Sequence, residues 1–131
     1  MDTPTLLALR PTVETAPGAL PAEAFQNVTL RPLLKLLHPR LVDAWHRYAE
    51  RQKGTFYRLN RPEQETYLRH ALRTNRELRS FYLGLVCAMM TPEEWGAFRQ
   101  NERELSRRLL SMTLQRLEGD DTTYRQPTLH Q

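Results

Sequence analysis

The chain has 131 residues, a length that suits one domain, and a formal charge of +4. No run of 18 apolar residues occurs, so we predict no membrane-spanning helix. The N-terminus lacks the basic and apolar segments of a secretory signal. A single cysteine, Cys87, excludes an internal disulfide and fits the reducing cytoplasm, where we expect the protein to reside.

Both ends of the chain are predicted to be flexible. Residues 1–21 are interrupted by Pro4, Pro11, Pro17 and Pro21 and hold few bulky side chains, which is typical of a disordered arm. Residues 120–131 are polar and show no periodicity, so we interpret them as a frayed tail. Residues 22–119 then form a helical bundle domain.

The first main helix is predicted to begin near Asn27 or Thr29, either of which can cap it. Pro39 interrupts the pattern and should kink or split the helix, and Gly54 ends it. Its apolar face comprises Leu30, Leu33, Leu34, Leu37, Leu41, Ala44, Trp45 and Tyr48.

Two shorter helices follow, each with a capping residue. Asn60 is the predicted cap of the second helix, and Thr74 or Asn75 marks a break before the third. The third helix has an apolar face at Leu78, Phe81, Tyr82, Leu85 and Met89. Small residues four apart, which would let a neighbouring helix approach closely, occur at Ser80, Gly84 and Ala88.

The last helix has the strongest start signal. Thr91 and Glu94 form a capping box around Pro92. Apolar residues, among them Trp95, continue at helical spacing toward Gly119, a candidate left-handed cap. One helix over 92–118 would span roughly 40 Å. No segment alternates with period two, so the predicted fold is all-α: an irregular four-helix bundle with a long C-terminal helix and flexible tails.

One possible metal site lies on the first helix. Asp43, His46 and Glu50 share part of one helical face. Helical di-metal sites also require a Glu-x-x-His motif, which is absent, so a solvated face is the favoured interpretation and no metal is predicted. No catalytic set or phosphate-binding glycine loop is visible, so we predict no cofactor and lean against an enzyme.

Two basic groups are candidate binding sites. Gln26, Asn27, Arg31 and Lys35 surround the predicted helix start, where free N–H groups could help to bind an anion or a partner. Arg69, Arg73 and Arg76 could form a phosphate-attracting stripe for nucleic acid. For both groups the simpler alternative is an ordinary solvated surface, with Asn27 acting only as a cap.

Three motifs resemble a poorly characterised family of small helical proteins from Bacteroidota-type bacteria. They are Phe25-Gln26-Asn27-x-Thr29-Leu30-Arg31-Pro32-Leu33-Leu34-Lys35-Leu36, Asn101-Glu102-x-Glu104-Leu105-x-Arg107-Arg108 and Gln115-Arg116-Leu117. Members of that family sometimes carry a glyoxalase label. The metal-dependent βαβββ glyoxalases need strands bearing His and Glu ligands, and neither is visible here. The resemblance therefore implies a helical fold and no mechanism.

The favoured function is a non-catalytic interaction or regulatory module that associates with itself, as a homodimer, or with another helical protein. A nucleic-acid-associated protein is the first alternative. A metal-binding or glyoxalase-labelled enzyme is the second.

Overall fold

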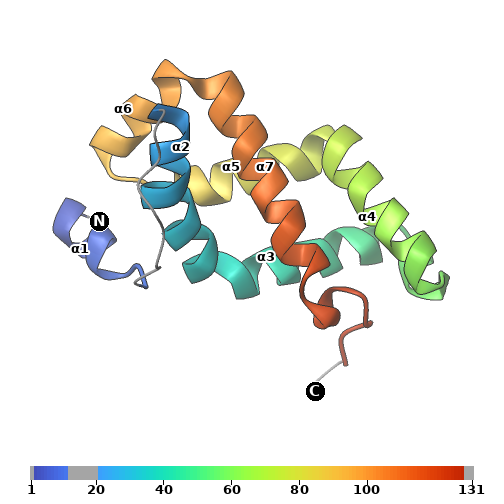
Figure 1. The fold of residues 1–131 in the computed structure, drawn as a ribbon. Coiled ribbons are helices and arrows are strands. Elements are labelled where there is room, and N and C mark those ends of the chain that lie inside the picture. The colour runs from blue at the N-terminus through green and yellow to red at the C-terminus, as the bar shows by residue number, and fades with distance from the viewer. Residues whose placement is uncertain (1, 12–20, 129–131) are drawn as a thin grey trace.

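The computed structural model describes residues 2–11 and 21–128, and these residues form helices and turns without any strand. The predicted all-α class is therefore confirmed (Figure 1). The elements are α1 (Thr3–Ala8), α2 (Pro21–Phe25), the π-helical segment η1 (Gln26–Leu30), α3 (Arg31–Arg51), the 3-10 turn η2 (Thr55–Arg58), α4 (Arg61–Thr74), α5 (Arg76–Cys87), α6 (Pro92–Gln100), α7 (Glu102–Glu118) and the 3-10 turn η3 (Asp121–Thr123).

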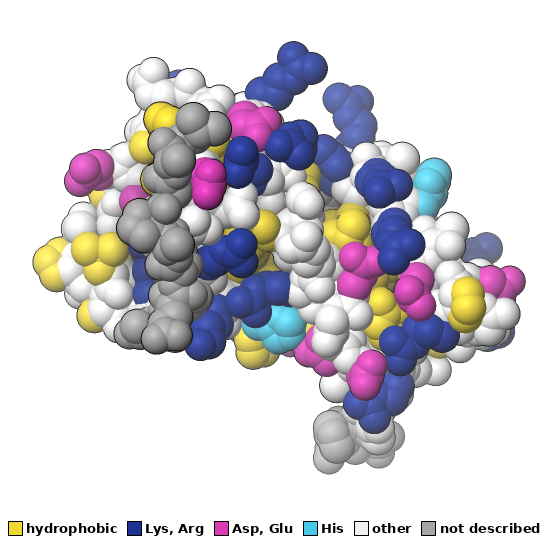
Figure 2. Space-filling view, viewed as in Figure 1, with side chains coloured by type: hydrophobic (Ala, Val, Ile, Leu, Met, Phe, Trp, Pro, Cys, Tyr) yellow, Lys and Arg dark blue, Asp and Glu magenta, His cyan; other side chains and the backbone are white. Residues whose placement is uncertain are grey.

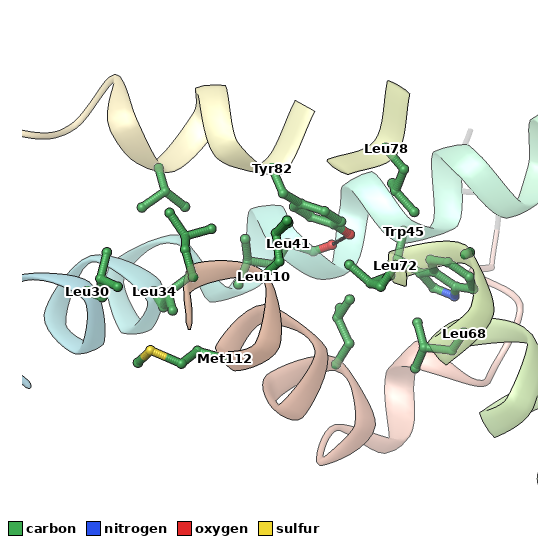
Figure 3. Packing of buried hydrophobic residues seen from close by; sticks show 14 of the residues in the cluster. Leu30, Leu34, Leu41, Trp45, Leu68, Leu72, Leu78, Tyr82, Leu110 and Met112 are labelled. Atoms are coloured by element: carbon green, nitrogen blue, oxygen red, sulfur yellow. Dashed lines mark hydrogen bonds between the residues drawn. The ribbon is translucent and has the colours of Figure 1, made fainter. Parts of the chain in front are cut away.

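The core lies where α3, α4, α5 and α7 meet, and α3 supplies much of it. Leu34, Leu41 and Trp45 of α3 are fully buried, and Figure 3 shows them between side chains of the other three helices. The buried hydroxyl of Tyr82 donates a hydrogen bond of 2.8 Å to the Leu41 carbonyl, so this polar group is satisfied. Each buried leucine contributes about 1.5–3 kcal/mol of apolar transfer free energy.

None of the helices in the described part of the chain is long and apolar enough to cross a membrane.

The first main helix begins earlier than predicted. Helical backbone continues from α2 through η1 into α3, so neither Asn27 nor Thr29 caps a helix. The Arg31 N–H bonds to the carbonyl of Gln26, five residues back, as in a π-turn. Pro32 accounts for the widened turn, because its ring lacks an N–H and would crowd the carbonyl four residues back. The helix is not split at Pro39, since α3 continues to Arg51.

The prediction of one helix over residues 92–118 is wrong. Asn101, at φ −139° and ψ 45°, leaves helical geometry and separates α6 from α7. Trp95 on α6 is 43% exposed, whereas Leu105 and Leu109, which continue the apolar spacing on α7, are buried. Gly119 has φ −83°, so the predicted left-handed cap does not form.

The break at Asn101 lets α6 fold back onto the start of the main helix. Phe98 is buried, with its ring centre 6.3 Å from that of Phe25, and the Trp95 ring stacks on it at 5.9 Å. Burial of a phenyl ring contributes about 1.5–3 kcal/mol, which offsets helical hydrogen bonds given up at the break.

Both chain ends pack more closely than the sequence predicts. Leu6 of α1 is buried, and Arg10 forms an ion pair with Glu94. At the other end, Thr123 of η3 and the following Tyr124 are buried. The expected flexibility of residues 12–20 and 129–131 falls outside the described residues.

Candidate functional site

The three candidate metal ligands, Asp43, His46 and Glu50, do not form a metal site in the described structure. His46 Nε2 lies 2.8 Å from the Thr122 carbonyl oxygen, which can only accept, so this nitrogen carries the proton. The other ring nitrogen, Nδ1, accepts from the Tyr57 hydroxyl at 2.6 Å, and no lone pair remains for a metal. Asp43 and Glu50 are exposed. Across residues 2–11 and 21–128, no three His, Cys, Asp or Glu side chains gather to hold an ion.

His46 instead fixes the C-terminal segment to α3. Burial lowers its pKa, although the hydrogen bond to Thr122 and the nearby carboxylates of Glu50 and Asp43 oppose the shift. The neutral imidazole is therefore the form that fits the fold.

A second histidine of α3 holds the same segment. His38 Nε2 lies 2.8 Å from Asp120 Oδ2, and its Nδ1 faces Arg116 Nη1 at 3.4 Å. Hydrogen bonds from Thr122, and then from His38, lower the pKa of Asp120 to about 2. These contacts join residues about 80 positions apart, so no local sequence pattern predicts them.

The three arginines proposed for nucleic acid differ in their surroundings. Arg69 is bonded to Glu118 at 2.6 Å and lies 3.8 Å from Glu65, so acidic neighbours largely match its charge. Arg73 and Arg76 are exposed and form no ion pair with a described residue. Figure 2 shows acidic side chains interspersed among the basic ones on the visible face. The basic stripe is therefore interrupted.

The group around Arg31 is not at a helix N-terminus. The backbone N–H groups here are used within η1 and α3, so the predicted help from free N–H groups is absent. Arg31 Nε donates to Asn27 Oδ1 at 3.1 Å, and Arg108 donates to Gln26 Oε1 at 2.9 Å. Lys35 is exposed, about one turn further along α3.

The outward face of α5 has an unusual composition. Its exposed positions after Glu77 are Ser80, Phe81 and Gly84, followed by Ala88 at the helix end, and none is charged. Phe81 is 42% exposed, so its predicted place in the core is wrong. A Cβ added at Gly84 would meet no atom within 4 Å, so no helix of the described chain covers this stripe.

A shallow groove of about 180 Å³ runs beside this face, between α5 and the second half of α3. Arg47 and Arg51 line it on α3, with Glu77, Leu78 and Phe81 on α5. Arg47, Arg51 and Glu77 form no ion pair with another described residue. The groove thus combines an exposed ring with unpaired charges of both signs.

Cys87 does not provide a reactive thiolate. Burial, and then the charge of Glu102, raises the pKa of this thiol to about 11. At neutral pH it is therefore protonated and a poor nucleophile.

Comparisons of this chain with protein-family models, curated proteins and solved structures give no match. The resemblance to a Bacteroidota-type family stays a prediction.

Proposed function

We propose that the protein is a non-catalytic helical interaction module that self-associates through the exposed face of α5. The observation that carries this proposal is the absence of charge along that face after Glu77. Solvent-facing helix surfaces of soluble domains are normally charged, as α4 is at Arg69 and Arg73. A face of small residues beside a half-exposed phenylalanine is better suited to a partner than to water.

The chemistry of the face favours a second copy as that partner. Ser80, Gly84 and Ala88 offer little side-chain bulk, so a second α5 can approach closely, and Phe81 can act as an aromatic anchor. Two-fold pairing brings one surface against itself, which requires self-complementarity. The adjacent groove meets this requirement, because Arg47 and Arg51 supply positive charge and Glu77 negative charge.

Sedimentation of Gly84→Arg and Phe81→Arg tests the proposal. Both positions are exposed, and replacing a helical glycine raises helix propensity by up to about 1 kcal/mol, so the monomer should fold normally. We expect the unmodified chain to be dimeric and both variants to be monomeric with unchanged circular dichroism. Ser111→Arg, at an exposed position of α7, is the matched control and should remain dimeric. A monomeric unmodified chain at about 1 mM would refute the proposal.

Nucleic-acid binding is the second candidate, favoured by the exposed and unpaired Arg73 and Arg76. Filter binding over a salt series tests it, because phosphate contacts weaken steeply as salt rises. Absence of binding at low salt would exclude it. The metal-dependent alternative is not proposed, since the lone pair of His46 is used by Tyr57.

A further inference from the structure

A hollow of about 210 Å³ lies between α3 and α7, on a different part of the molecule from the α5 face. It is lined by Arg31 of α3 and by Met112, Gln115 and Arg116 of α7. Lys35 follows Arg31 by one helical turn. Figure 2 shows Lys and Arg side chains gathered where the first half of α3 passes beside α7. Two cations and an amide thus converge on one small space.

The two arginines have no carboxylate to balance them. Arg116 Nη1 lies 3.4 Å from His38 Nδ1, and Arg31 Nε donates to the amide oxygen of Asn27. Neither guanidinium lies within 4 Å of an acidic oxygen of the described residues. The pKa of Arg116 is lowered, first by burial and then by the positive charge of Arg31. The folded chain therefore holds two like charges close enough to repel each other.

We propose that this hollow binds a single phosphoryl group, as inorganic phosphate or as a small phosphomonoester. A guanidinium presents paired N–H donors that match two oxygens of a phosphate, and two such groups can grip one tetrahedral anion. Arg31 retains its Nη donors, because only Nε is used by Asn27. Gln115 adds an amide donor, and the buried Met112 forms an apolar part of the wall.

The surroundings favour a single anion over a nucleic acid. A neighbouring hollow shares Gln115 and Arg116, but its other lining residues include Asp120 and Asp121. Carboxylates there would repel the next phosphate of a polynucleotide, whereas they could accept hydrogen bonds from hydroxyl groups of a small phosphorylated ligand. The expected ligand therefore has one phosphoryl group and a polar, hydroxyl-bearing remainder.

Titration calorimetry with inorganic phosphate, against chloride at a constant ionic strength of about 0.1 M, tests the site directly. We expect a dissociation constant on the order of 1 mM. Arg31→Gln and Arg116→Gln should each weaken binding by about tenfold or more, because each removes charge-assisted hydrogen bonds. Arg73→Gln removes the same charge from an exposed position of α4 and should leave binding unchanged.

Melting temperatures distinguish a binding role from a structural one. Without phosphate, Arg31→Gln should melt at or above the temperature of the unmodified chain, because the substitution relieves repulsion of Arg116. Phosphate should raise the melting temperature of the unmodified chain and not that of the variant. A lower melting temperature of Arg31→Gln without phosphate would instead indicate a structural role and overturn the proposal.

Two further outcomes would overturn it. One is the absence of phosphate binding, or binding that Arg73→Gln weakens as much as Arg31→Gln. The other is tight, salt-sensitive binding of an oligonucleotide with none of phosphate, which would indicate a polyanion surface. Gly84→Arg, on α5, should retain phosphate binding, so this result is separable from self-association.

Discussion

Glu94 joins three parts of the chain, and its replacement by glutamine should destabilise the protein strongly. Its carboxylate accepts two hydrogen bonds from Arg10, at 2.5 and 2.6 Å, and one from Thr29 at 3.1 Å. It also completes the capping box of α6 by accepting from the Thr91 backbone N–H at 2.9 Å. The side chain of Arg10 is only 7% exposed and that of Glu94 only 16%.

The expected loss follows from the burial of this pair. Glutamine keeps the size of the side chain but removes the negative charge, which leaves the Arg10 guanidinium buried without its counterion. Breaking a buried ion pair by removing one partner costs about 3–5 kcal/mol. Because the site is not completely dry, we expect the low end, about 3 kcal/mol. For a domain of this size that corresponds to a fall in melting temperature of about 10 °C.

The pH dependence of Glu94 has a definite sign. Burial alone would raise the pKa of this carboxyl, but hydrogen bonds from Arg10, from the Thr91 backbone and from Thr29 outweigh it and lower the pKa. The charged form is therefore favoured by folding. The stability it contributes is present above the ordinary pKa of 4.5 and is lost as the pH falls below that value.

Urea and thermal unfolding at pH 7 measure the loss. Glu93→Gln changes an exposed acid in the same helical turn and should cost no more than about 0.5 kcal/mol, through the helix dipole alone. Removing both partners, as in Arg10→Met with Glu94→Gln, should cost less than the sum of the two single changes. A loss below about 1 kcal/mol for Glu94→Gln, or strict additivity in the double variant, would refute this reasoning.

Three other measurements address separate parts of the fold. Because burial lowers the pKa of His46, the unfolded chain binds more protons than the folded chain below pH 6.5. The free energy of unfolding should therefore fall there by at most about 1.4 kcal/mol per pH unit. His46→Gln should remove this pH dependence from urea unfolding curves. Phe56→Ala empties a fully buried site between Trp45 and Tyr124 and should cost about 3–5 kcal/mol in the same assay, whereas a loss under 1 kcal/mol would contradict the packing. Cys87, with its thiol pKa raised to about 11, should react with iodoacetamide far more slowly than free cysteine at pH 8; equal rates would contradict its burial.

The local signals of the sequence predicted local structure well. The capping box at Thr91 is confirmed, as are the caps at Asn60 and Asn75, because each depends on groups only three residues apart. The ion pair between Glu104 and Arg108, four residues apart on α7, is a local contact of the same kind and is 2.8 Å long. Such contacts form wherever the helix forms, so the sequence is sufficient to predict them.

The misplaced residues show where helical periodicity fails. Spacing places Phe81 and Trp95 on apolar stripes, yet both are more than 40% exposed. Periodicity indicates which residues share a face, but the width of the buried part depends on the neighbouring helices. The break at Asn101 has no local signal for a related reason, because the contact that favours it, Phe98 against Phe25, joins residues far apart in the sequence.

The candidate sites depend even more on long-range contacts. Spacing groups Asp43, His46 and Glu50 on one helical face, but the His46 ring is hydrogen-bonded to Tyr57 and Thr122. The sequence places Arg31 at a helix start that the structure lacks, and the fold instead brings it beside Arg116, far along the chain. An anion site built by two helices cannot be predicted from either helix alone.

The two proposed surfaces share one scaffold and should nevertheless act independently. α3 contributes Arg47 and Arg51 to the groove beside α5, and Arg31 to the hollow beside α7. At 1.5 Å per residue, Arg31 and Arg47 are about 24 Å apart along the helix, well beyond the Debye length of about 8 Å at physiological salt. Charge at one site is therefore screened from the other. Any coupling between phosphate binding and dimerisation would have to pass through the packed core of α3, and the effects of Arg31→Gln and Gly84→Arg should otherwise be additive.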